Sequence, residues 1–413
     1  MRQQRLTHTW TPRVLILLAS LSFVAAPRVT VHADDGNAVK FAPIRAKMQE
    51  FVDRNDISGA VTVVGRRSGI ISIDAVGSLR VEDNHPMPRD GIFRIASMTK
   101  PITAIGIMIL VDKGELSVDD PVDKHLPEFR GQMLVAARDG ETVTLKKPSR
   151  PITIRDLLTH TSGLPGGMPP GLSDLYAKRN HTLAEAVMAF SQRPLDFEPG
   201  TKWAYCNAGI DTLGRIIEVV SGKSYEGFLA TNISEPLGMK DTACFLDNSR
   251  RTRLAGLYEK KDGKLVAAAN PLIGVDPEAR YSMPAGGLIS TGQDLAKLYQ
   301  MMLGRGTLGK TRIISESSVA TMTQLQTGDL TAGFTPGMGF GFGWAVVREP
   351  QGVTEMLSSG SFGHGGAFGT QAWIDPKQDL FVILLIQRVG LPNADGSEMR
   401  REFQSLAVGA IKN

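Results

Sequence analysis

The sequence predicts an α/β fold in which an antiparallel sheet is built from both ends of the chain, with an all-α region inserted between them. Two short apolar segments near the start, residues 59–69 and 70–81, meet at a glycine and are typical of a β-hairpin. Three strand-like segments follow one another near the end, at residues 341–349, 369–377 and 379–388. Helical patches and Gly/Pro-rich loops lie between these two sets. Strands at both ends with helices between them favour one sheet that draws on both termini.

These patterns place the sheet-containing part at about residues 38–125 and 285–413, and the inserted helical part at about residues 126–284. The chain has 413 residues, of which 42% are hydrophobic and 21% charged. Those proportions are ordinary for a soluble globular protein and allow a large core. Residues 34–413 are expected to form the functional domain.

Residues 1–33 are predicted to be a secretory signal peptide. Three arginines precede residue 14, and the apolar stretch 14–26 is too short to favour a membrane span. Small residues before Asp34 favour cleavage after Ala33. An uncleaved anchor helix is the alternative. We therefore expect a periplasmic or secreted protein without a stable membrane span after cleavage.

The charge and the ligand-forming residues exclude several function classes. Residues 1–33 hold four of the 46 basic residues and none of the 42 acidic ones, so the remainder is near neutral and predicts no nucleic-acid binding. The seven histidines form no HExxH motif and no Cys/His pattern, so no metal site is expected. Two cysteines, Cys206 and Cys244, do not make a disulfide framework.

Ser97 and Lys100 stand three residues apart, just before the apolar segment 102–111. Ser97 has two interpretations: it is a helix cap, or it is a nucleophile with its own base. In a helix, positions i and i+3 share a face. The apolar segment predicts a buried helix, and burial lowers the pKa of a lysine so that it can accept a proton. The context therefore favours the nucleophile.

Acyl transfer also needs a proton donor and an oxyanion hole. Tyr205 and Asn207 offer a phenol and an amide just before a second apolar helix. The segment His364-Gly365-Gly366 begins a strand, where glycines let a substrate approach the backbone. As alternatives, Tyr205 is a buried tyrosine with one hydrogen bond, and His364 is an ordinary turn histidine.

The order of these motifs is informative. S-x-x-K at 97–100, Y-x-N at 205–207 and H-G-G at 364–366 together resemble the serine β-lactamase and penicillin-binding-protein superfamily. The Y-x-N form is similar to class C β-lactamases, DD-peptidases, D-aminopeptidases and β-lactamase-like carboxylesterases. Two further segments look like this family, residues 157–165 and 281–291. The resemblance implies the fold predicted above and no cofactor.

The resemblance also implies roles for individual residues. Ser97 would be the acylated nucleophile, and Lys100 and Tyr205 would share the general-base and general-acid work. Asn207 would hold Lys100 and a substrate carbonyl. The backbone N–H groups of Ser97 and Ala367 would form the oxyanion hole. Because Cys206 lies between two of these residues, we expect its side chain in the core and no disulfide to the other cysteine.

The third motif departs from the Lys-Thr-Gly of many relatives. His364 replaces a permanent cation with a group expected to titrate near neutrality, and Gly365 and Ala367 carry no hydroxyl. Such hydroxyls help carboxypeptidase-like relatives to bind a substrate carboxylate. Each lost charge-assisted hydrogen bond costs about 1.5–3 kcal/mol. Arg388, near the end of a predicted strand, is a candidate replacement partner for that carboxylate.

These departures favour an exported serine hydrolase that cleaves ester or amide bonds, most of all small carboxylic esters. A β-lactamase or a D-amino-acid peptidase, of the DD-carboxypeptidase or D-aminopeptidase type, is the alternative. An acyltransferase and a non-catalytic binding protein of the same fold also stay open, because function depends on the site and not on the fold. The expected partner is a small ester, a β-lactam or a short peptide.

Overall fold

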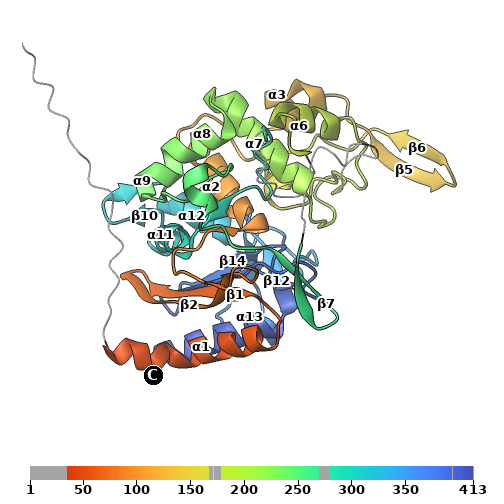
Figure 1. The fold of residues 1–413 in the computed structure, drawn as a ribbon. Coiled ribbons are helices and arrows are strands. Elements are labelled where there is room, and N and C mark those ends of the chain that lie inside the picture. The colour runs from red at the N-terminus through yellow and green to blue at the C-terminus, as the bar shows by residue number, and fades with distance from the viewer. Residues whose placement is uncertain (1–34, 167–170, 172–177, 269–278, 393, 413) are drawn as a thin grey trace, which may run out of the picture.

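The computed structural model has an eight-stranded antiparallel sheet at its centre (Figure 1). It describes residues 35–412, apart from 167–170, 172–177, 269–278 and 393. The predicted signal peptide lies outside the described residues. Within them, no helix combines the length and apolarity needed to cross a membrane.

The sheet confirms the predicted use of both chain ends. Its strands run in the order β12-β13-β14-β15-β16-β1-β2-β3. The hairpin of β1 and β2, near the start of the chain, therefore pairs with β16, near its end, with Val63 opposite Ile383. The strands are β1 Gly59–Arg66, β2 Gly69–Arg80, β3 His85–Pro86, β12 Met338–Phe340, β13 Ala345–Val347, β14 Phe362–Gly365, β15 Gln371–Asp375 and β16 Leu380–Leu385.

Helices cover both faces of this sheet because its strands are apolar on both sides. Along β1, Val61 and Val63 pack into one core, and Ala60 and Val64 pack into the other. The terminal helices α1 and α13 lie side by side below the sheet in Figure 1, and α11 packs on the opposite face. Their bounds are α1 Asp35–Asp53, α11 Gly292–Leu303 and α13 Glu398–Lys412.

The inserted part packs around two helices, α2 Thr99–Asp112 and α7 Asn207–Ser221. Residues 99–110 of α2 are all buried, as the apolar sequence predicts. Gly106 permits the close approach, because a Cβ there would lie 2.8 Å from Cδ1 of Ile217 on α7. Among the described residues, the other α-helices are α3 Val122–His125, α4 Ile154–Leu158, α6 Leu183–Ser191, α8 Tyr225–Leu229, α9 Glu235–Leu237, α10 Asn248–Arg251 and α12 Glu316–Thr323.

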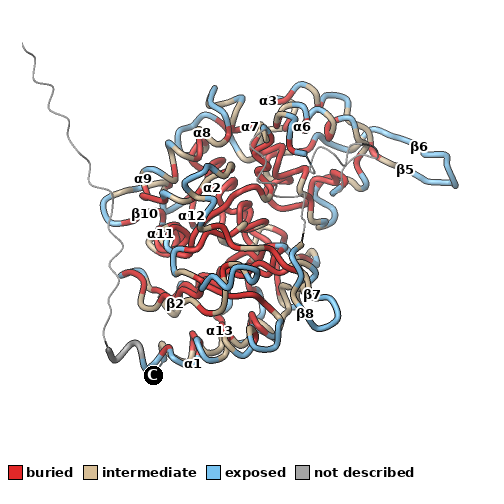
Figure 2. The backbone as a smooth tube through the Cα atoms, in the orientation of Figure 1, coloured by how far each residue is buried: buried red, intermediate tan, exposed pale blue. Residues whose placement is uncertain are grey.

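The middle of the chain also contains two hairpins that the sequence analysis did not anticipate. Strands β5 Leu134–Asp139 and β6 Thr142–Lys146 extend from the body, and Figure 2 shows them largely exposed. Strands β7 Tyr258–Lys261 and β8 Lys264–Ala267 form the second hairpin. The missed signal in β5–β6 is the Asp-Gly pair at residues 139–140, a hairpin indicator that here leads into the two-residue turn at 140–141. Short pairs also form between β4 Phe93–Arg94 and β9 Ile289–Ser290, and between β10 Thr307–Leu308 and β11 Thr311–Arg312.

Candidate active site

Ser97 lies where strand β4 gives way to a short 3-10 helix, Ala96–Met98, that leads into α2. The residue before it, Ala96, has a φ of 47°, a left-handed conformation that is strained for a side chain other than glycine. The residue that caps α2 is Met98, and no side chain caps either helix. The helix-cap interpretation of Ser97 is therefore wrong, and its half-buried hydroxyl is available for another role.

Lys100 contacts Ser97 directly. Its Nζ lies 3.0 Å from Oγ of Ser97 and donates to the carbonyl oxygen of Ala285 at 2.6 Å. The side chain is fully buried in the apolar α2. Burial lowers the pKa of Lys100 from its ordinary 10.5 to about 7, although the nearby Asp211 carboxylate raises it. Near neutral pH, a large fraction of Lys100 is therefore an amine that can accept the Ser97 proton.

Tyr205 completes this group from the loop before α7. The Nζ of Lys100 lies 4.6 Å from the centre of the Tyr205 ring, and the Tyr205 hydroxyl interacts with the Ser97 side chain. Burial raises the pKa of Tyr205 above its ordinary range. The phenol therefore stays protonated at neutral pH and can donate a proton to a leaving group. The structure thus brings the three predicted catalytic side chains together.

Asn207 begins α7 on the same side but does not hold Lys100 as expected. Lys100 donates to the Ala285 carbonyl instead, and Oδ1 of Asn207 is buried without a hydrogen-bond partner among the described residues. The buried Sγ of Cys206 accepts a hydrogen bond from the Gly209 N–H at 3.3 Å and caps α7. Both cysteines are free and buried, which confirms that they form no disulfide with each other.

His364 is a buried residue of β14, and one expectation about it is wrong. Its Nδ1 lies 2.6 Å from the carbonyl oxygen of Gly365, and its Nε2 has no partner among the described residues. A carbonyl only accepts, so Nδ1 carries the proton. Burial, together with the nearby Lys100 charge, lowers the pKa of His364 from its ordinary 6.5 to about 4. His364 is therefore neutral at physiological pH, because the strand hides it from water.

The two glycines after His364 permit two different close approaches: Gly366 packs against the residues just before Ser97, and Gly365 packs against Asp395 and Gln371. A Cβ at Gly366 would lie 2.5 Å from the Ile95 carbonyl oxygen and 3.4 Å from the Ala96 Cβ. A Cβ at Gly365 would lie 2.1 Å from Oδ1 of Asp395. Ala367, the next residue, is exposed. Neither its N–H nor that of Ser97 has an acceptor within the described part of the chain. Both groups are thus free to bind a developing oxyanion.

Asp211 is a site residue that the sequence analysis missed. It is fully buried on α7, one turn after Asn207, and accepts hydrogen bonds from the Tyr281 hydroxyl and, at 2.8 Å, from the Ala285 N–H. The same Ala285 offers its carbonyl to Lys100. Asp211 therefore fixes the position of the group that holds Lys100. A buried aspartate one turn into an apolar helix was the available signal.

His160 is the second missed residue. It follows α4 with a φ of 60°, and its Nδ1 accepts a hydrogen bond from the Cys206 N–H at 3.1 Å. Its ring lies 4.6 Å from that of Tyr205. Burial lowers the pKa of His160 well below its ordinary value, so the ring is neutral. Through the ring contact with Tyr205 and the hydrogen bond to the Cys206 backbone, His160 positions the loop that carries Tyr205. The segment that contains it had been noted only as part of the family resemblance.

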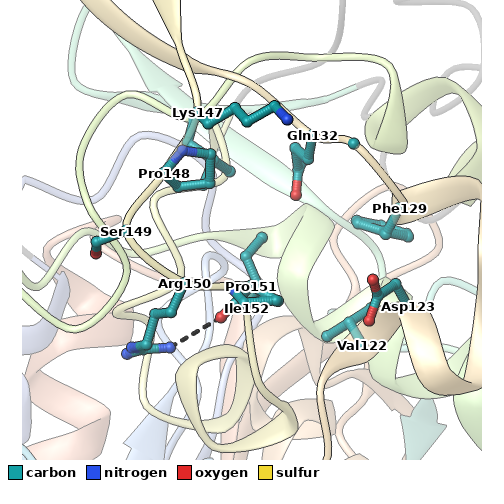
Figure 3. A pocket seen from close by; sticks show the side chains of 12 residues that line it. Val122, Asp123, Phe129, Gln132, Lys147, Pro148, Ser149, Arg150, Pro151 and Ile152 are labelled. Atoms are coloured by element: carbon teal, nitrogen blue, oxygen red, sulfur yellow. Dashed lines mark hydrogen bonds between the residues drawn. The ribbon is translucent and has the colours of Figure 1, made fainter.

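A cavity of about 250 Å³ lies away from these residues (Figure 3). None of its described lining residues is a predicted site residue. Arg150, one of the basic residues that line it, donates hydrogen bonds to the Asp156 carboxylate at 2.6 and 2.9 Å and to the Pro151 carbonyl. This cavity therefore does not compete with the Ser97 group as the candidate active site.

Comparison with known proteins agrees with this geometry. A model of the beta-lactamase family matches residues 44–406. The chain belongs to this family. It is 31% identical over 371 residues to esterase EstB of Burkholderia gladioli. That alignment covers 83% of this chain and 89% of EstB. It is 32% identical over 285 residues to penicillin-binding protein 4 of Amycolatopsis lactamdurans, 68% of each chain.

Solved structures show the same fold. The hydrolase EstCE1, described as having promiscuous acyltransferase activity, aligns with a TM-score of 0.75 and 24% identity over 92% of this chain and 100% of that chain. An octameric penicillin-binding-protein homologue from Pyrococcus abyssi aligns with a TM-score of 0.68 and 26% identity, over 89% and 77% of the two chains. The protein is thus a β-lactamase-fold hydrolase with both esterase-like and penicillin-binding-protein-like relatives.

Within this family framework, Arg388 does not serve as the expected carboxylate partner. Its guanidinium donates to the backbone carbonyls of Asp56, at 3.0 Å, and Val389. It is 7% exposed. Because its guanidinium is bound to these backbone carbonyls, Arg388 does not replace the missing lysine of the third motif.

Proposed function

We propose that the protein is an exported serine hydrolase that cleaves carboxylic esters through an acyl-enzyme on Ser97. The observation that carries this proposal is the 3.0 Å contact between Oγ of Ser97 and a buried Nζ of Lys100 with a lowered pKa. Lys100 takes the proton of Ser97 as Oγ attacks the ester carbon. Tyr205 gives its proton to the leaving alkoxide and recovers it from Lys100. Water then cleaves the acyl-enzyme by the reverse sequence.

The preference for esters follows from the third motif. His364 is neutral, and Gly365, Gly366 and Ala367 supply no hydroxyl. A β-lactam or a D-alanyl peptide would therefore place its carboxylate beside groups that do not neutralise it. At about 1.4 kcal/mol per decade, each missing charge-assisted bond corresponds to roughly 10- to 100-fold in affinity.

One observation favours the second candidate, a β-lactamase or D-amino-acid peptidase. Arg400 is 1% exposed, and its Nε and Nη2 have no partner among the described residues. It lines a narrow cavity together with His364 and Gly365. Its guanidinium carbon lies 4.2 Å from the centre of the Trp373 ring.

A direct comparison separates the two candidates. We would measure burst-phase and steady-state turnover of p-nitrophenyl butyrate and of a chromogenic cephalosporin, and locate the acyl group by peptide mass spectrometry. The ester is expected to have a kcat/KM at least 100-fold above that of the cephalosporin, with the butyryl group on Ser97. Faster cephalosporin turnover that is lost in Arg400→Met would instead establish the second candidate.

Export is part of the proposal and has its own test. Expression of the full chain in a bacterium that secretes should give a periplasmic or extracellular protein whose first residue is Asp34. Recovery of the full-length chain in the membrane fraction would favour the uncleaved anchor instead.

The rate of acylation should depend on pH through Lys100. The amine is the active form, and burial lowers its pKa to about 7, so the rate should rise through pH 7 and level off above it. Tyr205 and His364 do not change charge between pH 5 and 9, because the pKa of the first is raised and that of the second is lowered to about 4. Stopped-flow acylation rates across that range check this. A rate that stays level from pH 5 to 9 would instead fit a base that is already deprotonated at pH 5, such as His364.

Asp211→Asn should move the rise of the acylation rate from near pH 7 toward lower pH. The Asp211 carboxylate raises the pKa of Lys100, so an uncharged amide lets it fall further. The acylation rate on the plateau should drop by about 10-fold, because the amide holds Ala285 less well. Tyr281→Phe is the matched control: it removes one hydrogen bond to Asp211 but no charge, so its limb should stay in place. Equal shifts in both variants would contradict an electrostatic role for Asp211.

A further inference from the structure

An aromatic side chain stands exposed beside the proposed proton donor. Phe334 is 49% exposed, which is unusual for a phenylalanine. Its ring centre lies 4.9 Å from that of Tyr205 and 5.7 Å from that of Trp203, in edge-to-face arrangements. One face of an aromatic group is thus kept open to solvent at the site instead of being buried in the core.

Phe334 also lies where two cavities meet. A cavity of about 420 Å³ is lined by residues 329–338 together with Arg348 and Glu349. A narrower one passes Phe340 and His364, and both cavities share Phe334. The loop that carries Phe334 is anchored at Gly337, whose carbonyl accepts the N–H groups of Arg348 and Glu349 at 2.8 and 2.9 Å. The wider cavity is large enough for an aryl group.

The cavity walls on the catalytic side are aromatic. Trp203 lies 5.3 Å from the buried Phe340, and Phe340 lies 6.1 Å from the buried His364, so further aromatic rings pack behind the exposed Phe334. His364 is neutral, as described above. An edge-to-face or offset-stacked contact with a further ring is therefore available at the exposed face of Phe334.

The proposed mechanism decides which half of an ester binds here. Tyr205 protonates the leaving oxygen, so the alcohol half must lie beside the Tyr205 hydroxyl, while the acyl half is bound to Ser97. Phe334 contacts Tyr205, and therefore faces the alcohol half. We propose that Phe334, Trp203 and the 329–338 loop form a binding site for the alcohol group of the substrate, and that this site prefers aryl or arylalkyl alcohols. This inference rests on the proposed esterase function.

The chemistry stays balanced whichever alcohol occupies the site. The bond between the Ser97 Oγ and the acyl carbon forms as the carbon–oxygen bond to the alcohol breaks. The proton that leaves Ser97 is delivered, through Lys100 and Tyr205, to the departing oxygen. Phe334 takes no part in these transfers; it determines how well one class of alcohol is held while they occur.

Two butyrate esters test the site. 2-Phenylethyl butyrate and ethyl butyrate form the same butyryl-enzyme and differ only in their alcohol. Phe334→Ala should lower kcat/KM for the phenylethyl ester about 10-fold more than for the ethyl ester, equivalent to about 1.4 kcal/mol. Phe334→Trp, which keeps an aromatic face, should restore the difference. Leu145→Ala, at an exposed apolar residue of the β6 hairpin, is the matched control and should change neither value.

The possible results are distinguishable. The rate of deacylation should be the same in Phe334→Ala as in the parent, because the alcohol has left by then. Equal losses for the two esters, or a loss that follows the length of the acyl chain, would overturn the assignment of this site to the alcohol. If the parent forms no butyryl-Ser97 from either ester, the proposed function itself fails, and the result is separate from any effect of Phe334.

Discussion

Ser97→Ala should abolish acylation while leaving the fold intact. Alanine removes the only atom of this side chain that can attack a carbonyl, and loss of a nucleophile lowers turnover by about 10⁴- to 10⁶-fold in serine hydrolases. The free energy of unfolding should change by less than about 1 kcal/mol, because Ser97 is half-buried and caps neither helix. Burst amplitude, fluorophosphonate labelling and thermal denaturation measure these effects.

Activity and stability together separate a catalytic role of Ser97 from a structural one. Lost activity with a parent-like melting temperature places the chemistry on Ser97. Retained ester turnover would show that another nucleophile acts, or that the measured activity is a contaminant's. A large loss of stability would mean that the Ser97 hydroxyl has a structural role, which the absence of a cap hydrogen bond argues against.

Lys100→Met should be nearly inactive as well. Methionine has a similar length and suits the apolar surroundings of α2, but it cannot accept a proton. Loss of a positioned general base typically costs about 10²- to 10⁴-fold. The acylation rate should therefore fall by about 10³-fold, and it should lose the limb near pH 7 that Lys100 gives the parent. Pre-steady-state rates from pH 5 to 9 check both statements.

The same variant should be at least as stable as the parent at pH 7. Lys100 is charged in the unfolded chain but has a pKa of about 7 when folded. Folding at neutral pH therefore weakens the binding of this proton, and this lowers the free energy of unfolding. Because the folded pKa is the lower one, this penalty is largest below pH 7 and disappears as the pH rises toward 10.5. The stability advantage of Lys100→Met should shrink over the same range. A strongly destabilised variant would show that Lys100 is mainly structural.

Much of the fold could be predicted from local patterns in the sequence. The hairpin of β1 and β2 and the buried helix α2 follow from the period of their apolar residues, and strands at both chain ends made a shared sheet the simplest arrangement. The exposed β5–β6 hairpin was missed because the surrounding helical patches dominated the middle of the chain. Its pairing is also unsupported by a core, since β6 is exposed throughout.

The sequence by itself determined the pairing of Ser97 with Lys100, because a three-residue spacing in a helix puts two side chains on one face. Only the tertiary structure decided what surrounds them. Asp211 and Ala285 are 74 residues apart in the chain, and they meet because α7 packs against the segment that follows Tyr281. The neutral state of His364 likewise depends on the burial of β14, since a pKa reflects the solvent and charges that the folded chain places around a group.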